Sequence, residues 1–239
     1  MAVIQAELQK LYDAGAHFAL PRTRRHPTAV PFIYSTKDRT DIFDLEKTTK
    51  RLSAAEAFVR ELAQAGKTLV FVGGKTEVIA VVKDDAVKIG APYVAGRWIG
   101  GTLTNFKNIR KRIDRLEKLM EEREKGELEK YTKRERLLID REIEELLARF
   151  GGIVNLRELP GALFVIDTRH ENTAVKEAKQ LGIPVVGLAS SDCDFSLVKY
   201  PIPANDTSVK SVQFVVGAIA NAYAEGKRAP KAENKPAKA

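Results

Sequence analysis

The sequence predicts an α/β fold in which helices cover both faces of a parallel sheet. Two observations lead to this prediction. First, apolar runs without alternation, such as LVFV at 69–72 and ALFVID at 162–167, are typical of strands that are buried on both faces. Second, segments with helical periodicity separate these runs, and strands that alternate with helices form βαβ units with right-handed crossovers.

The N-terminal part begins with a helix and continues as a basic loop. Residues 3–13 place apolar side chains on one helical face, and Gly15 ends this helix. Three prolines then exclude a regular helix from HFALPRTRRHPTAVPFIY, so we expect an ordered loop that leads into a strand at 32–35. A second helix is expected at 44–65, with a glycine directly after it.

The later elements follow the same alternation of strand and helix. Glycines follow several of the predicted helices, as is common where a helix must end. We expect further helices at 75–89, 171–181 and 205–224, and strands at 69–72, 92–95, 162–167 and 183–188. This alternation predicts that 1–104 and 151–226 together form one α/β domain.

Residues 105–150 interrupt this pattern with two amphipathic helices. Apolar residues recur every three or four positions, at Phe106, Ile109, Ile113, Leu116 and Met120, and again at Ile139, Ile143, Leu146 and Phe150. Gly126 separates the helices, and Thr132 with Glu135 predicts a capping box. This spacing predicts an inserted antiparallel coiled-coil hairpin, which at ~1.5 Å per residue would project on the order of 25–30 Å. Its balanced charges fit either a solvated hairpin or a contact with RNA or protein at the tip.

The composition favours a polyanionic partner and excludes several classes of protein. The 239 residues carry a formal net charge of +8, which favours nucleic acid or an acidic surface as partner. Residues 227–239 are rich in Ala, Pro and Lys, and we expect a disordered basic tail. No apolar run approaches the ~20 residues that cross a bilayer, and no signal peptide is visible. The single cysteine, Cys193, fits a reducing compartment.

No motif predicts a catalytic or metal site. The segment VFVGGKTEV follows a strand but lacks the first glycine of a phosphate-binding loop, because Leu69 stands there. The histidines are scattered, and Asp192 and Asp194 lack a third ligand, so we expect no metal and no cofactor. Asp167 ends a strand where open sheets bind ligands, yet the donors that follow it at 168–170 suit an anion.

Cationic side chains in loops and at one helix start form the candidate binding site. Arginine forks match phosphate geometry, and phosphate contacts supply most nonspecific affinity for nucleic acid. The predicted RNA-binding residues are Arg22, Arg24, Arg25, Arg97, Arg110, Lys111, Arg112 and Arg169.

The segment that joins the strand at 92–95 to the hairpin is the predicted hinge. The hinge and anchor residues are Trp98, Gly100, Gly101, Thr104 and Phe106. The two glycines allow a sharp turn out of the sheet, and Thr102 or Thr104 is expected to cap the helix that follows. The two aromatic residues either stack on bases or anchor the base of the hairpin against the core, and we favour the anchor for Trp98.

Several blocks of the chain resemble one family. RWIGGTLTNF, preceded by PYV, resembles the signature of the bacterial form of the small-subunit ribosomal protein S-two family. The resemblance continues through AGAHFALPRTRRHPTAVPFIY, VFVGGKTE, LPGALFVIDTRHENTAVKEAKQLGIPVVGLASSDCD and YPIPANDTSVKSVQFVVGAIANAYAEG. These blocks are colinear and span residues 8–226.

The resemblance implies a flavodoxin-like parallel sheet with a protruding coiled-coil hairpin. It also implies a structural, non-catalytic role in the small subunit of the cytoplasmic ribosome, with no small-molecule substrate and no membrane contact. Family members contact small-subunit ribosomal RNA and neighbouring ribosomal proteins and join late in assembly. They also help to seat the large first protein of the subunit, where an organism has one.

The chain departs from the family pattern mainly in its basic N-terminal loop. Ala19 and Leu20 stand in place of Gly and His, and His26 and Pro27 follow the arginines where Trp, Asn and Pro are usual. Ala204 replaces a glycine near the C-terminus. Because Leu20 removes the second histidine, the resemblance carries over neither a metal contact there nor the geometry of this loop.

Two other functions remain open from the sequence. One is an enzyme that holds a phosphorylated metabolite at the strand ends near Gly73, Asp167 and Ser190. The other is a regulatory module whose hairpin grips another protein.

Overall fold

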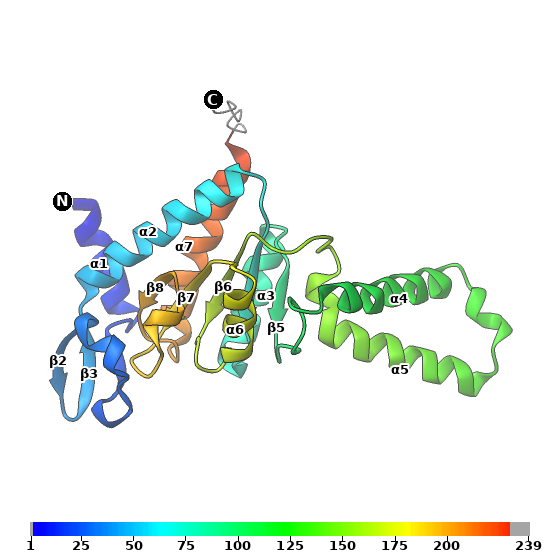
Figure 1. Cartoon of the computed structure of the whole chain (residues 1–239), viewed down its shortest axis with the longest axis horizontal. Helices are drawn as coiled ribbons and strands as arrows, with labels where there is room; N and C mark the ends of the chain where they lie inside the picture. Colours follow the sequence, from blue (N-terminus) through cyan, green and yellow to red (C-terminus); the bar gives the residue numbers. More distant parts are fainter. Residues whose placement is uncertain (1, 230–239) are drawn as a thin grey trace.

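The chain folds around a five-stranded parallel sheet, which confirms the predicted α/β architecture with a parallel sheet (Figure 1). The computed structural model describes residues 2–229. The strands are β4 Leu69–Gly73, β5 Tyr93–Ala95, β6 Ala162–Ile166, β7 Val185–Ala189 and β8 Tyr200–Pro203. They lie in the order β5-β4-β6-β7-β8. Counted from β4, this order is 2-1-3-4-5, which is that of flavodoxin-like folds.

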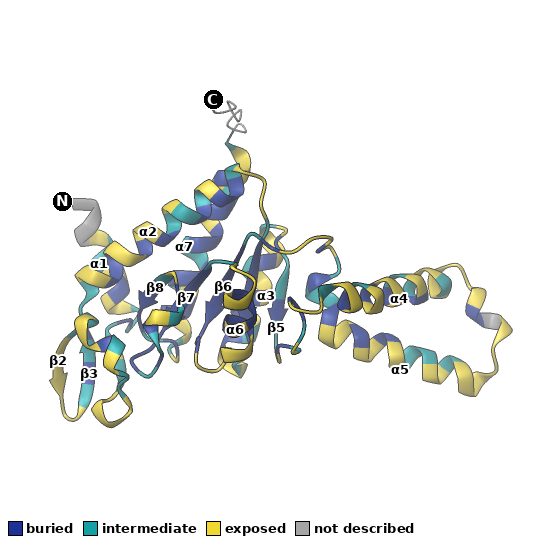
Figure 2. Cartoon of the chain, in the orientation of Figure 1, coloured by how far each residue is buried: buried dark blue, intermediate teal, exposed yellow. Residues whose placement is uncertain are grey.

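Helices cover both faces of this sheet, and each face has its own core. The covering helices are α2 Leu45–Gln64, α3 Thr76–Lys88, α6 Asn172–Gln180 and α7 Val209–Arg228. One core joins α2, α3 and α7 to Phe71 and Phe164, and the other joins α6 to Val70 and Val165. Successive residues of a strand point to opposite faces, so β4 and β6 are apolar and buried along their whole length (Figure 2).

Two long helices extend from the sheet beyond β5, side by side (Figure 1). They are α4, Phe106–Glu124, and α5, Lys133–Phe150. Their buried residues are Ile109, Ile113, Leu116 and Leu119 of α4, and Ile143, Leu146 and Phe150 of α5. Leu119 was not in the predicted stripe, whereas the predicted Met120 is only partly buried. The predicted capping box at Thr132 and Glu135 is present, with both of its hydrogen bonds.

A three-stranded antiparallel sheet lies at the end of the molecule opposite to α4 and α5 (Figure 1). It follows α1, Ala2–Asp13, and contains β1 Phe18–Pro21, β2 Ile33–Lys37 and β3 Thr40–Phe43 in the order β1-β3-β2. We predicted a loop here and one strand at 32–35, so β1 and β3 were missed. These strands are short, β2 is mostly exposed and β3 alternates partly buried with buried residues, so they lack the apolar runs that identify strands of the main sheet.

Two further elements differ from the prediction. β8 was missed because two of its four residues are prolines, which sheets tolerate at an edge. α7 begins at Val209, capped by Ser208, and continues through Arg228. Lys227 and Arg228, which we assigned to the tail, are therefore helical, and the rest of the predicted tail at 230–239 lies outside the described residues.

Short 3-10 turns complete the described chain. They lie at Arg22–Arg24, Pro27–Phe32, Glu127–Lys130, Gly151–Ile153 and Phe195–Leu197. Between residues 2 and 229, no helix combines the length and the apolar character that crossing a bilayer requires.

Candidate nucleic-acid interface

A buried ionic cluster holds the carboxyl edge of the parallel sheet together. Lys75 comes shortly after β4, Asp167 directly after β6 and Asp206 shortly after β8. The Lys75 Nζ lies 2.6 Å from Asp167 Oδ2 and 2.9 Å from Asp206 Oδ2. Because these strands are parallel, their ends bring the three charges to one edge, where this class of fold binds ligands.

The charges and the local backbone fix this cluster. Burial alone would lower the pKa of the Lys75 ammonium, but the hydrogen bonds and charges of the two carboxylates outweigh burial and raise it. Burial also opposes ionisation of Asp167, yet Lys75 and the N–H groups of His170 and Arg169 lower the pKa of this carboxyl. Those two N–H groups donate to Asp167 Oδ1 at 3.0 and 3.1 Å. The Lys75 ammonium is therefore engaged within the fold.

The basic N-terminal segment crosses the same edge and is held there by Ser191. The Leu20 N–H donates to Ser191 Oγ at 3.1 Å, and the His26 N–H donates to the Ser191 carbonyl at 2.7 Å. Arg25 turns inward, with its guanidinium 3.5 Å from the carboxylate of the fully buried Asp41. These contacts leave Arg24 at the surface.

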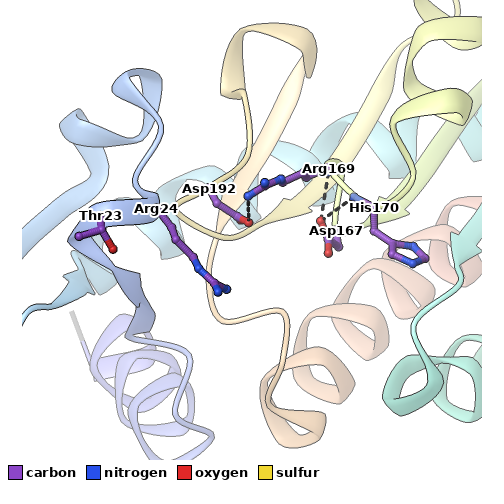
Figure 3. Close-up of a pocket in the computed structure, with 6 residues that line it drawn as sticks. All are labelled: Thr23, Arg24, Asp167, Arg169, His170 and Asp192. Carbon is purple, nitrogen blue, oxygen red and sulfur yellow. Dashed lines mark hydrogen bonds and ion pairs between the residues drawn. The ribbon is translucent and has the colours of Figure 1, made fainter.

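A cleft of about 760 Å³ opens between this segment and the loop after β6 (Figure 3). It is lined by Thr23, Arg24, Asp167, Arg169, His170 and Asp192. Figure 3 shows Arg24 and Arg169 entering the cleft from opposite sides. Arg169 donates to Asp192 at 2.7 Å, whereas in the described part of the chain no carboxylate forms an ion pair with Arg24. Of the two arginines in the cleft, Arg169 is therefore paired with a carboxylate of the described chain and Arg24 is not.

A second cleft of about 670 Å³ lies at this edge, next to the loop that leads to α4. It is lined by Gly74, Arg97, Trp98, Gly100, His170, Glu171 and Thr173. His170 borders both clefts, so they form one strip. Arg24, Arg169 and the exposed Arg97 come from three separate segments and all line this strip. The fold thus brings together three of the predicted arginines that are distant in the sequence.

The loop from Trp98 to Thr104 is fixed by Glu177 of α6, which sequence reasoning missed. The Glu177 carboxylate accepts from Trp98 Nε1, from the N–H groups of Gly101, Leu103 and Thr104, and from the Thr104 hydroxyl, at 2.7 to 3.4 Å. Burial opposes its ionisation, but the backbone donors outweigh burial and lower the pKa of Glu177. A charged residue on an otherwise apolar helix face was the only signal in the sequence.

The predicted hinge residues lie at the base of α4. Trp98 is 6% exposed and packs in the core on the α6 side, so its ring is not available for base stacking. Phe106 is partly buried against the same core. Gly101 has a φ of +89°, in the region that favours glycine. Gly100 has no such φ and borders the second cleft instead.

The predicted threonine caps of α4 are wrong. Thr102 donates its hydroxyl to the Ile99 carbonyl, and Thr104 donates its own to Glu177. The residue at the cap position is Asn105, and its side chain accepts no capping hydrogen bond. The threonines therefore shape the loop, and the carboxylate that satisfies its N–H groups comes from another helix.

The remaining predicted cations have different surroundings. Arg110 is held internally: its guanidinium donates to the Val154 and Leu156 carbonyls at 2.7 and 3.3 Å and pairs with Asp114 and Glu117. The predicted RNA contact of Arg110 therefore conflicts with its structural role at the base of α4. The other three cations, Arg22, Lys111 and Arg112, are exposed but line neither cleft.

Two findings concern metal binding and the single cysteine near this edge. Across residues 2–229, no group of three or more His, Cys, Asp or Glu side chains is placed to hold a metal ion. Cys193 is fully buried, and burial raises the pKa of its thiol to about 12.

Gly74 owes its identity to close packing, since a Cβ there would lie 2.5 Å from Glu171 Oε1 and 2.7 Å from the Gly96 carbonyl oxygen.

Fold and site together define a flavodoxin-like α/β protein with arginines along its carboxyl edge. The family model described as Ribosomal protein S2 matches residues 11–226. Similar proteins include two named "Small ribosomal subunit protein uS2". The one from Coprothermobacter proteolyticus is 42% identical, covering 95% of this chain and 84% of that protein. The one from Dictyoglomus thermophilum is 39% identical, covering 92% of this chain and 89% of that protein. The chain therefore belongs to the ribosomal protein S2 family.

Proposed function

We propose that this chain is a structural constituent of the small ribosomal subunit and binds small-subunit ribosomal RNA through the carboxyl edge of its sheet. Membership of the ribosomal protein S2 family supports this role, as do relatives named as small-subunit proteins. Such a constituent acts by holding RNA and neighbouring proteins in place. The role requires no cofactor, no small-molecule substrate and no catalysis.

The strip of arginines along the two clefts is the observation that carries the RNA-binding proposal. Arg24 and Arg97 are exposed, and Arg169 lies between the segments that bear them. Guanidinium groups bind phosphate oxygens in pairs, and neutralised phosphates supply sequence-independent affinity. Pockets for small molecules are mostly apolar, whereas polar and charged side chains line the first cleft. The strip therefore fits the backbone of a folded RNA.

The predicted cations outside the strip divide into exposed side chains and side chains that are paired within the protein. Arg22, Lys111 and Arg112 are exposed and remain proposed phosphate contacts. Arg25 and Arg110 are bound within the protein. Their proposed role is to position the basic loop and the base of α4, next to which the exposed cations lie.

We also propose that α4 and α5 form an antiparallel coiled coil inserted at 105–150 into a domain made of 1–104 and 151–226. The buried stripe of α4 and α5 supports this proposal, because its spacing follows a heptad. A projecting coiled coil reaches RNA or a neighbouring ribosomal protein. On this proposal the chain joins the subunit late and helps to seat the large first protein, in organisms that have one.

The test is a charge reversal at the two exposed arginines. Arg24→Glu combined with Arg97→Glu should weaken RNA binding at least tenfold, roughly the effect of losing one charge-assisted hydrogen bond, and should reduce incorporation into small subunits. Occupancy is measured by sedimentation through a high-salt sucrose gradient, in cells that carry only the variant.

The matched control places the same charge change at the opposite, amino edge of the sheet. Lys67→Glu combined with Lys179→Glu alters two exposed lysines there and should leave occupancy unchanged. Full occupancy of small subunits by the Arg24 and Arg97 variant would contradict the proposed interface. Circular dichroism must show that both variants are folded.

A further inference from the structure

One buried carboxylate connects α6 to the loop from which α4 emerges. Glu177 Oε1 accepts from Trp98 Nε1 at 3.3 Å and from the Gly101 N–H at 2.7 Å. Its other oxygen accepts from the N–H groups of Leu103 and Thr104 at 2.9 and 3.2 Å. With 7% of its surface exposed, Glu177 is shielded from water. A residue on a helix packed against the sheet thus engages three backbone N–H groups of this loop and the indole N–H of Trp98.

These donors have no equivalent acceptor within their own segment. Helix starts usually rely on a side chain at the cap position, but Asn105 provides no such hydrogen bond to α4. An anion close to a helix N-terminus is also favoured by the helix dipole. Buried N–H groups that lose their acceptor are costly. Glu177 therefore fixes the turn that leads into α4, and does so from a separate helix.

Beside apolar contacts, the Arg110 hydrogen bonds to the Val154 and Leu156 carbonyls hold the base of α4, but they do not reach the loop that precedes it. Trp98, Leu103 and Ile109 join the core on the α6 side, and apolar contacts tolerate sliding because they lack directionality. Hydrogen bonds restrict both distance and angle. The turn at Gly100 and Gly101 contains the first of the bonded amides, that of Gly101, whose φ of +89° lies in the region that favours glycine.

We propose that Glu177 is the positioning residue that sets the direction in which α4 and α5 leave the sheet. Without its carboxylate, the loop before α4 loosens and the direction of the two helices becomes less well defined, while the sheet stays folded. This inference goes beyond RNA binding, since it concerns how the protein itself holds its projecting helices.

The test removes the carboxylate and measures both the loop and the helix direction. In Glu177→Ala, the amides of Gly101, Leu103 and Thr104 should exchange with solvent about 100-fold faster, with protection of β4 and β6 unchanged. Spin labels at Lys67→Cys and Arg123→Cys, both exposed positions, should show a broadened distance distribution. Cys193 stays unlabelled because it is fully buried. Acetate, which can occupy the vacated site, should restore part of the amide protection.

Two further variants make the result decisive. Glu177→Gln keeps the volume and one acceptor but loses the charge, so it should change exchange and distances in the same direction, by less. It decides the question if Glu177→Ala does not fold. Glu145→Ala removes an exposed carboxylate of α5 and should change neither readout. Wild-type exchange and distances in the Glu177 variants would overturn the proposal.

Incorporation into small subunits is measured separately on the same variants. A Glu177 variant whose helix direction changes but which still enters subunits supports the positioning role. It also shows that assembly does not require a fixed helix direction. A variant with unchanged helix direction that fails to enter subunits overturns the positioning role and leaves the RNA interface standing. The two proposals therefore fail independently.

Discussion

Replacing Lys75 by methionine tests how far the carboxyl edge depends on its buried ionic cluster. Methionine keeps much of the apolar stem of Lys75 but removes the charge that offsets Asp167 and Asp206. Each charge-assisted hydrogen bond contributes about 1.5–3 kcal/mol, and Lys75 makes one with each carboxylate. The Lys75 side chain is 26% exposed, so we take the lower part of that range. The free energy of unfolding should fall by about 3–4 kcal/mol at neutral pH.

The structure also predicts how the stability loss of Lys75→Met changes with pH. In the wild type, burial and then the charge of Asp167 raise the pKa of Asp206, and removal of Lys75 should raise the pKa of both carboxyls from their wild-type values. A carboxyl whose pKa is raised by folding destabilises the protein above that pKa. This penalty disappears as the pH falls through the raised value. In the wild type Asp167 behaves oppositely: its lowered pKa gives stability at neutral pH that acid removes.

The raised carboxyl pKa values in the variant and the lowered Asp167 pKa in the wild type both make the stability difference between the two proteins smaller in acid. The difference in unfolding free energy between wild type and Lys75→Met should shrink between neutral pH and about pH 4, near the ordinary carboxyl pKa. Urea denaturation followed by circular dichroism at several pH values measures this difference. Lys50→Met, at an exposed position of α2, is the control and should stay within about 0.5 kcal/mol of wild type. A loss below about 1 kcal/mol at neutral pH, or a difference that grows in acid, would refute this reasoning.

Two smaller predictions concern the base and the far end of α5. Gly152→Ala should cost about 1–3 kcal/mol, because a Cβ there would overlap the Tyr93 carbonyl oxygen of β5. Calorimetry should show a lower melting temperature, while the control Gly217→Ala, whose Cβ meets nothing within 4 Å, should be neutral or stabilising. Thr132→Ala should remove the capping box and cost about 1 kcal/mol, seen as faster amide exchange of Glu135. Unchanged exchange at Glu135 would show that the capping box adds nothing.

The main sheet could be predicted because its strands carry their own signal. A strand buried on both faces must be apolar at every position, as LVFV at 69–72 is. β1 and β3 carry no such signal, since they are short, contain no run of buried apolar residues and are stabilised by pairing with each other. β8 combines two prolines with an edge position, so its sequence resembles a loop. Pairing partners distant in the chain decide these elements, and a local pattern does not contain them.

The candidate site was predictable in residue type but not in arrangement. Arginines in loops pointed to a polyanion, yet nothing in the sequence places Arg24 beside Arg169. That neighbourhood depends on the two hydrogen bonds of Ser191 to the N-terminal segment. Glu177 was missed for a related reason, because the donors that it binds lie more than 70 residues earlier in the chain.

Net charge overstates how many cations this protein can offer to a phosphate. Arg25 lies against Asp41, Arg169 against Asp192, and Arg110 between two carboxylates and two carbonyls. Each of these arginines must weaken or break its existing ion pair before it binds another anion. The loss of that pair offsets part of the free energy gained by binding the new anion. If Arg110 turned to bind another anion, the carbonyls of Val154 and Leu156 would also lose their donor. Of the three arginines, Arg110 would therefore be the most costly to release. On the proposed function, the affinity of the strip for RNA should therefore depend most on cations at the surface, above all Arg24 and Arg97, while the paired arginines hold the neighbouring loops.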